Sequence, residues 1–196
     1  MPGEKHLREG VRRAYSAAAG RPGDKHPFPV GPHFAESVGY PADLLARLPP
    51  AAAEAFAGVS NVSLFAEIPE GSRVLDLGCG AGLDCLIAAE RTGSGGRVIG
   101  VDFSEAMLAR AREAVVQAGL GHVELRLAEA ERLPLEDGVI DVALVNGIFN
   151  LNPARTAVFR ELARVVRPGG RCYAAELILR DPFPPDSSQD EKNWFA

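Results

Sequence analysis

The sequence contains few cysteines, and they are not spaced as a cross-linking or zinc-binding set. Cys79, Cys85 and Cys172 are the three among 196 residues. Three dispersed cysteines cannot supply the disulfide framework of a small secreted domain, and none of their spacings matches a structural zinc site. We therefore expect reduced thiols in a cytoplasmic protein, each packed as a small buried side chain, and no metal site.

Long apolar runs and an excess of positive charge are also missing. No segment approaches the roughly 20 apolar residues of a membrane span, and residues 1–10 lack the apolar core of a signal peptide. The 21 Lys and Arg residues are scattered and are outnumbered by 26 Asp and Glu residues, which gives a net charge of −5. Proteins that bind nucleic acid commonly gather basic residues on one face. We expect neither a membrane nor a nucleic acid as a partner.

Composition divides the chain into three parts. Residues 1–70 hold three of the four histidines and an Ala- and Leu-rich helical segment at 41–56, and we interpret them as a helical N-terminal cap. Residues 71–180 alternate short β-branched runs with amphipathic helical stretches, the pattern of a parallel sheet covered by helices. Residues 181–196 are polar and proline-rich, which predicts a surface tail.

The middle part predicts a doubly wound α/β fold. Strands are expected at 73–77, 97–102, 123–127, 140–145 and 171–179. Helices are expected at 81–91, from the cap Ser104 to the stop Gly119, and from Asn152-Pro153 to Pro168-Gly169-Gly170. Right-handed crossovers then place ligands outside the carboxyl ends of the strands, near the switch point beside the first strand.

A glycine-rich segment, Asp76 to Gly82, reads DLGCGAG and joins the first strand to its helix. Glycine permits positive φ and lets the backbone approach a ligand closely. Nicotinamide and flavin proteins use G-x-G-x-x-G to hold a pyrophosphate, whereas here the third glycine comes one residue earlier and an aspartate precedes the first. That carboxylate would repel a pyrophosphate and suits an ammonium group, such as the amino-acid end of S-adenosylmethionine (SAM).

A second acid, Asp102, ends the second strand 20 residues after Gly82. A carboxylate at this place in a doubly wound fold can accept hydrogen bonds from both hydroxyls of a ribose. The glycine triplet alone is weak evidence. The aspartate, the triplet and the second acid in this order predict a cofactor site.

VLDLGCGAG resembles the first motif of the class I SAM-dependent methyltransferases, and the resemblance extends over roughly residues 70–180. It implies a Rossmann-like fold with SAM as the cofactor. By this resemblance the glycines pass under the methionine part of SAM, Asp102 holds the ribose, and Glu129 accepts from the adenine amino group, although a solvated loop acid is the alternative for Glu129. The cofactor-binding positions that it implies are Asp76, Gly78, Cys79, Gly80, Gly82, Asp102, Phe103, Met107, Glu129, Ala130, Asn146 and Gly147.

Asn146-Gly147 ends the fourth strand, where the resemblance places the meeting of the donor methyl group and the acceptor. Backbone carbonyls there, with Phe149 and Asn150, are expected to contact SAM or the acceptor. Asp141 precedes these residues in the same strand, and its expected role is architectural.

The N-terminal SVGYPADLLARLPP, the GLD after the glycine loop and VNGIFNLNP narrow the resemblance to the arsenite methyltransferase group and its relatives. In arsenic methylators, thiolates hold trivalent arsenic near the SAM methyl group. One of these cysteines belongs after the asparagine that ends the fourth strand, where this chain has Gly147, and residues 1–70 contain no cysteine. We expect another small-molecule methyl acceptor, with arsenite as the alternative.

No catalytic residue can be assigned from the sequence. The SAM sulfonium already activates the methyl group, so alignment of the acceptor is the main requirement. Tyr15, His33 and Asp84 are candidate bases, each with a structural role as its alternative.

Two other functions stay open at this point. A nicotinamide-dependent dehydrogenase is disfavoured by the glycine spacing. A non-catalytic module that binds SAM or a partner is the second, because the sequence leaves no residues for the further helix and antiparallel strand pair with which this class usually continues. A homodimer would protect the open edge of the fifth strand.

Overall fold

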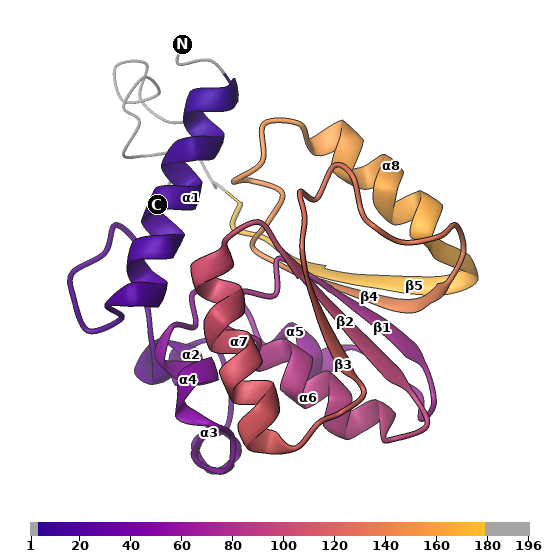
Figure 1. The fold of residues 1–196 in the computed structure, drawn as a ribbon, viewed down its shortest axis with the longest axis horizontal. Helices are drawn as coiled ribbons and strands as arrows, with labels where there is room; N and C mark the ends of the chain where they lie inside the picture. Colours follow the sequence, from indigo (N-terminus) through magenta and orange to yellow (C-terminus); the bar gives the residue numbers. More distant parts are fainter. Residues whose placement is uncertain (1–3, 179–196) are drawn as a thin grey trace.

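A computed structural model of the chain describes residues 4–178. At its centre is a five-stranded parallel sheet in the order β3-β2-β1-β4-β5 (Figure 1). The strands are β1 (Arg73–Leu77), β2 (Arg97–Asp102), β3 (Val123–Leu127), β4 (Ile140–Asn146) and β5 (Val166–Ala175). The chain leaves β1 towards one edge and returns to the other, so the predicted doubly wound fold is confirmed.

Helices cover both faces of the sheet (Figure 1). One face carries α5 (Val62–Phe65), α6 (Leu83–Thr92) and α7 (Glu105–Ala118), and the other carries α8 (Arg155–Val165). Side chains of β1 alternate between the faces: Val74 packs with the helix α6 side chains, and Leu75 packs with those of α8. The central strand is thus buried on both sides, as a parallel sheet requires.

The N-terminal region folds onto the helices of this sheet. It contains α1 (Glu4–Gly20), α2 (Pro32–Ser37), α3 (Ala42–Arg47) and α4 (Pro50–Glu54). Arg110 of α7 links α1 and α4 to the sheet helices. Its Nε donates to the carbonyl of Ala19 in α1 (2.6 Å), and its Nη1 donates to the carbonyl of Ala51 in α4 (3.3 Å). The apolar side chains of the region share clusters with α6 and α7. The boundary at residue 70 stays a prediction.

The helical segment predicted at 41–56 is confirmed, and it is divided in two. It forms two short helices, α3 and α4, separated by Leu48 and Pro49, both of which have extended backbone. A residue that precedes proline is pushed out of the helical region, and here both Leu48 and Pro49 precede one. The longer helix α1 has no counterpart among the sequence predictions.

The last helix and strand also begin elsewhere than predicted. Asn152 does not cap α8: its side chain accepts from the Ala154 amide (2.8 Å) and makes a turn before the helix begins at Arg155. The helix ends at Val165, and residues 168–170 lie inside β5, where the register against β4 shifts. The Pro-Gly-Gly segment at 168–170, which by itself predicts the end of a helix, thus forms a bulge in a strand.

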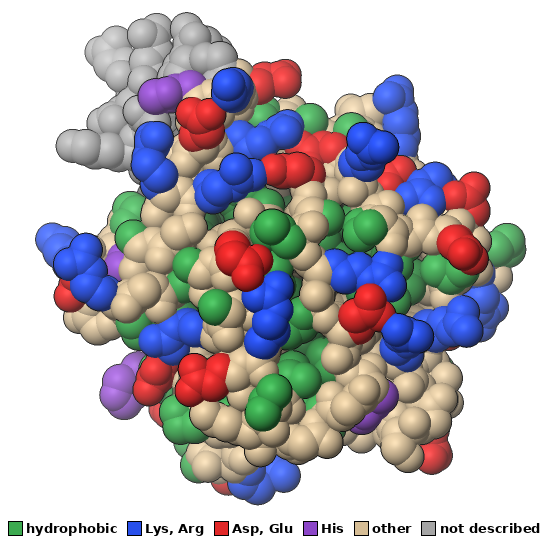
Figure 2. All heavy atoms as spheres, viewed as in Figure 1, with side chains coloured by type: hydrophobic (Ala, Val, Ile, Leu, Met, Phe, Trp, Pro, Cys, Tyr) green, Lys and Arg blue, Asp and Glu red, His purple; other side chains and the backbone are tan. Residues whose placement is uncertain are grey.

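Several sequence predictions fall on residues outside the described range. They are the end of the fifth strand at 179, the tail at 181–196, and the missing C-terminal strand pair. Among residues 4–178, none of the helices is both long enough and apolar enough to cross a bilayer. On the face drawn in Figure 2, acidic and basic side chains are interspersed.

Candidate functional site

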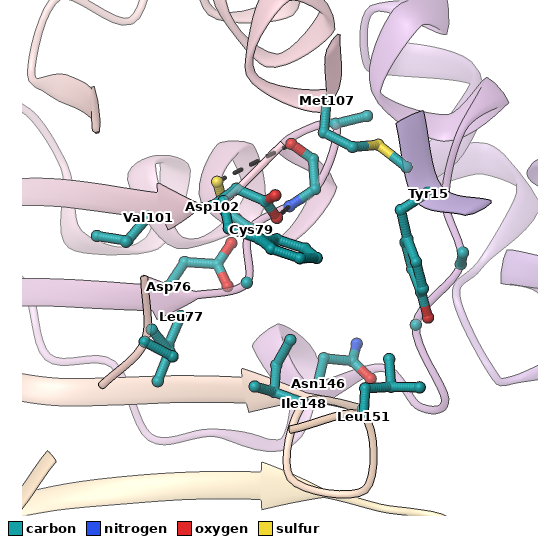
Figure 3. Close-up of a pocket in the computed structure, with 18 of the residues that line it drawn as sticks. Tyr15, Asp76, Leu77, Cys79, Val101, Asp102, Met107, Asn146, Ile148 and Leu151 are labelled. Atoms are coloured by element: carbon teal, nitrogen blue, oxygen red, sulfur yellow. Dashed lines mark hydrogen bonds between the residues drawn. The ribbon is translucent and has the colours of Figure 1, made fainter. Parts of the chain in front are cut away.

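A cavity opens at the carboxyl ends of β1, β2 and β4, with α1 over one side (Figure 3). Its volume is about 1010 Å³, which includes space that is open to solvent. The predicted site residues that line it are Asp76, Gly78, Cys79, Gly80, Asp102, Phe103, Met107, Glu129, Ala130, Asn146 and Gly147. These residues come from four separate connections, so the fold brings together what the sequence spreads over 72 positions.

The glycine loop is anchored to β2 through its backbone. The amides of Gly78 and Cys79 both donate to the carbonyl of Val101 (2.7 and 3.0 Å). Gly78 has φ 74°, a conformation that a side chain would strain. Gly82 is not among the cavity-lining residues: it precedes α6, and a Cβ there would lie 3.1 Å from the Cβ of Ala111 on α7. The absence of a side chain at Gly82 lets the start of α6 pack closely against α7.

Asp102 is held at the end of β2 by the backbone around it. It is 7% exposed, and its two carboxylate oxygens accept from the amides of Gly80 (2.9 Å) and Ser104 (2.8 Å). Burial raises its pKa to about 6, although these hydrogen bonds lower it. A carboxylate can accept about four hydrogen bonds, more than the backbone supplies here, and this one faces the cavity (Figure 3).

Asp76 lies deeper, beside two cysteines. One of its oxygens accepts from the Cys85 thiol (3.1 Å), and burial together with nearby Asp84 holds its pKa well above the usual range. Gly100, the neighbour of Asp76 in the parallel register, leaves room for the Cys85 and Cys79 sulfurs, which would lie 2.7 and 3.0 Å from a Cβ there. Cys79 and Cys85 are buried as expected, but Cys172 is exposed, so that prediction is wrong.

Both polar atoms of the Asn146 side chain form hydrogen bonds that hold the loop at 58–60 in place. Its Oδ1 accepts from the amides of Val59 (2.8 Å) and Ser60 (3.1 Å), and its Nδ2 donates to the Ser60 carbonyl (2.7 Å) and to Asp84 (3.0 Å). Tyr40 donates to the other Asp84 oxygen (2.6 Å). Asp84, a candidate base, also accepts from the Ser63 amide (3.3 Å), so both of its oxygens take part in hydrogen bonds that hold the cavity wall together.

Replacing Asn146 by Ala should destabilise the protein by about 2–3 kcal/mol, because partly buried donors and acceptors on two segments, the loop at 58–60 and Asp84, lose their partner. Urea unfolding followed by circular dichroism measures this free energy. The matched control is Asn61→Ala, since Asn61 is partly exposed and donates one side-chain hydrogen bond, to Gly39 (2.9 Å), which is exposed to solvent. Equal losses for the two variants would show that the Asn146 network adds nothing to stability.

Helix α1 supplies a wall of the cavity that the sequence analysis missed. Arg8, Val11 and Tyr15 line it. They lie three and four positions apart and therefore on one helix face, and this spacing was the available signal. Tyr15 was singled out only as a candidate base. Burial raises its pKa, so the phenol stays protonated at neutral pH and acts as a donor more readily than as a base.

Two arginines of α1 hold this wall against the loop that follows β3. Arg8 pairs with Glu131 (2.6 Å), and Arg12 pairs with Glu129. The Arg12 guanidinium also lies 5.3 Å from the centre of the Phe103 ring, a cation–π contact. Glu129 therefore lines the cavity with its carboxylate already shared with a cation.

Three other predicted positions lie away from the cavity lining. His33 is exposed on α2, which removes it as a candidate base. The amides of Phe149 and Asn150 donate to Glu176 (3.0 and 2.9 Å), and neither residue lines the cavity. Ile148 and Leu151 line it in their place. Within the described part of the chain, no group of His, Cys, Asp and Glu side chains could hold a metal ion.

Comparison with known proteins agrees with this architecture. A methyltransferase domain family matches residues 68–195. An arsenite methyltransferase from Halobacterium salinarum is 41% identical over 155 residues, which cover 79% of this chain and 39% of that protein. A demethylmenaquinone methyltransferase from Bacillus cytotoxicus is 39% identical over 111 residues, which cover 56% of this chain and 46% of that protein. The chain therefore spans less than half the length of either curated relative.

Among solved structures, an arsenic(III) S-adenosylmethionine methyltransferase from Chlamydomonas reinhardtii superposes with a TM-score of 0.61. It is 29% identical, and the match covers 79% of this chain and 51% of that one. The chain belongs to the methyltransferase domain family, and its fold is that of the class I SAM-dependent methyltransferases.

Proposed function

We propose that the chain is a SAM-dependent methyltransferase that transfers a methyl group to a small-molecule acceptor. The observation that carries this proposal is the buried carboxylate of Asp102, which the Gly80 amide holds beside the glycine loop at the mouth of the cavity. A carboxylate with free acceptor positions at the end of β2 suits the two hydroxyls of a ribose.

The chemistry of the walls supports SAM in particular. Phe103, Met107 and Ala130 offer an apolar surface for an adenine, and Gly78 and Gly80 let backbone approach the methionine part. Asp76 is buried and forms no ion pair with another described residue, which suits the ammonium group. SAM supplies a methyl group on a sulfonium, and the role of this chain is to orient the acceptor and exclude water.

Calorimetric titration of the chain with SAM and, separately, with NADH tests the cofactor. SAM should bind and NADH should not, because the acids around the glycine loop oppose a pyrophosphate. NADH binding without SAM binding would favour the dehydrogenase alternative. If SAM binds but is never consumed with any acceptor, the chain is a non-catalytic SAM-binding module.

Arsenite is the second candidate acceptor, favoured by the relative from Halobacterium salinarum. The cavity supports it poorly. Cys79 is the cavity-lining cysteine among the described residues, and its buried thiol donates a long hydrogen bond to the Gly80 carbonyl (3.9 Å). Gly147 stands where the resemblance places an arsenic thiol. An acceptor other than arsenite is therefore the better proposal, and methylation assays with arsenite decide between the two.

The proposal also includes the compartment of the protein and the kind of partner that it binds. The three free cysteines support a reducing compartment, such as the cytoplasm. The interspersed charges on the face in Figure 2 support a small molecule over a nucleic acid as partner. A homodimer stays a prediction.

A further inference from the structure

The cavity has two chemically different sides (Figure 3). Asp76, Cys79 and Asp102 lie on the side of β1 and β2, which the proposed function gives to SAM. Across the cavity lie Tyr15, Ile148 and Leu151, with Asn146 beside them, and Val11, Phe56 and Pro153 also line the cavity. Apart from Asn146 and the Tyr15 hydroxyl, the side chains labelled on this side are apolar, so it is suited to a molecule with an apolar body.

One polar atom on the apolar side is free. The Tyr15 ring stacks on Phe28, with ring centroids 4.4 Å apart, and this contact fixes its orientation. Its hydroxyl points towards the part of the cavity near Asn146 and Leu151 (Figure 3). Among residues 4–178 the hydroxyl has no hydrogen-bond partner, whereas the Tyr40 hydroxyl has two. A hydroxyl that points into the cavity and has no partner among the described residues can donate a hydrogen bond to a ligand.

The charges around the cavity are almost all negative. Asp76, Asp84, Asp102 and Glu129 line it. The one cation in the described lining is Arg8, and Glu131 already pairs with it at 2.6 Å. A carboxylate or phosphate brought into this cavity would lose its hydration, and the one cation of the described lining is already paired with an acid.

We propose that the acceptor subsite takes an uncharged, compact and mainly apolar molecule, and that Tyr15 is a specificity-determining residue that donates a hydrogen bond to its polar group. This inference rests on the proposed function, since it needs SAM on the opposite side. In the transfer, a lone pair of the acceptor heteroatom forms the bond to the methyl carbon. The bond from sulfur to that carbon breaks, its electron pair stays on S-adenosylhomocysteine, and the acceptor proton passes to water.

Three probes of similar size and different charge test the charge preference: 4-methylphenol, 4-methylbenzoate and 4-methylbenzylamine. The full chain is first saturated with S-adenosylhomocysteine, and each probe is titrated by calorimetry at pH 7. The phenol should bind about ten-fold more tightly than the benzoate or better, because the subsite offers the anion no cation. Benzoate binding as tight as phenol binding would overturn the proposal, and so would failure of all three probes to bind the loaded protein.

Tyr15→Phe tests the hydrogen bond. It should weaken 4-methylphenol binding by about three- to ten-fold, the value of one neutral hydrogen bond, and leave the affinity for S-adenosylhomocysteine unchanged. Tyr173→Phe removes the same atom from a residue outside the cavity lining and should change neither affinity. Unchanged phenol binding in Tyr15→Phe would overturn the role of Tyr15. Failure of folded wild-type protein to bind S-adenosylhomocysteine would overturn the proposed function itself, which separates the two failures.

Discussion

Replacing Asp102 by Ala is expected to weaken SAM binding by about 1.5–3 kcal/mol, a loss of about 10- to 150-fold in affinity. The variant loses charge-assisted hydrogen bonds to the ribose hydroxyls, and it also frees the Gly80 amide that positions the glycine loop. Calorimetric titration with SAM measures the loss. Asp137→Ala is the matched control, because Asp137 is an exposed acid that pairs with Arg164 (2.7 Å) away from the cavity. Similar SAM affinities in the two variants would remove Asp102 from the site.

The same residue predicts how SAM binding depends on pH. The pKa of Asp102 in the folded chain is about 6, above its ordinary value of 3.8, because of burial. The carboxylate is therefore lost as pH falls below about 6, and SAM affinity should fall with it. The stability of the unliganded chain moves the other way: the contribution of the protonated group is fully present below 3.8 and is lost as pH rises through about 6. Asp102→Asn should remove the contribution of this carboxyl group to the pH dependence of SAM affinity and to that of the stability of the unliganded chain.

The second large effect is expected at Gly78. Gly78→Ala should destabilise the protein by about 2–5 kcal/mol, because it combines a positive φ with a close contact. An added Cβ would lie 2.0 Å from Cδ1 of Ile148, so the loop after β4 must move away from the glycine loop. SAM affinity should fall as well, since both loops line the cavity.

Gly71→Ala is a closely matched control for the backbone component. Gly71 has φ 77°, almost the same as the 74° of Gly78, but nothing lies within 4 Å of an added Cβ. Its loss of stability, measured by urea unfolding, should therefore be about 1–2 kcal/mol. The double variant with Gly78→Ala and Ile148→Ala should recover part of the contact energy. Equal losses at Gly71 and Gly78 would show that the contact with Ile148 does not contribute.

Local sequence patterns located most of the sheet. The predicted strands at 73–77, 97–102 and 123–127 have the bounds that the structure shows, because each is a short run of strand-forming residues between turn residues. The limits of α7 are local: the Ser104 side chain accepts from the Met107 amide (3.4 Å), and Gly119 has φ 66°. Interactions within four residues decide the ends of this helix, so the sequence predicts them.

Predictions were wrong where a distant partner overrides a local signal. Residues 168–170 were expected to end a helix, but pairing with β4 draws them into β5. Asn146 was expected to offer its backbone to a ligand, and its side chain proves to be used by segments 58–60 and Asp84. In both cases the deciding partner lies more than 20 residues away along the chain.

The sequence by itself determined the order of strands and helices, the glycine loop, and the acid at the end of the second strand. These depend on hydrophobic periodicity, on the conformational freedom of glycine and on the fixed hand of parallel crossovers. Only the tertiary structure decided that α1 closes the cavity, where Arg8 meets Glu131 and Tyr15 faces Leu151. More than 120 residues separate the partners in each of these pairs. The packing of whole elements sets their distance, and no local pattern encodes it.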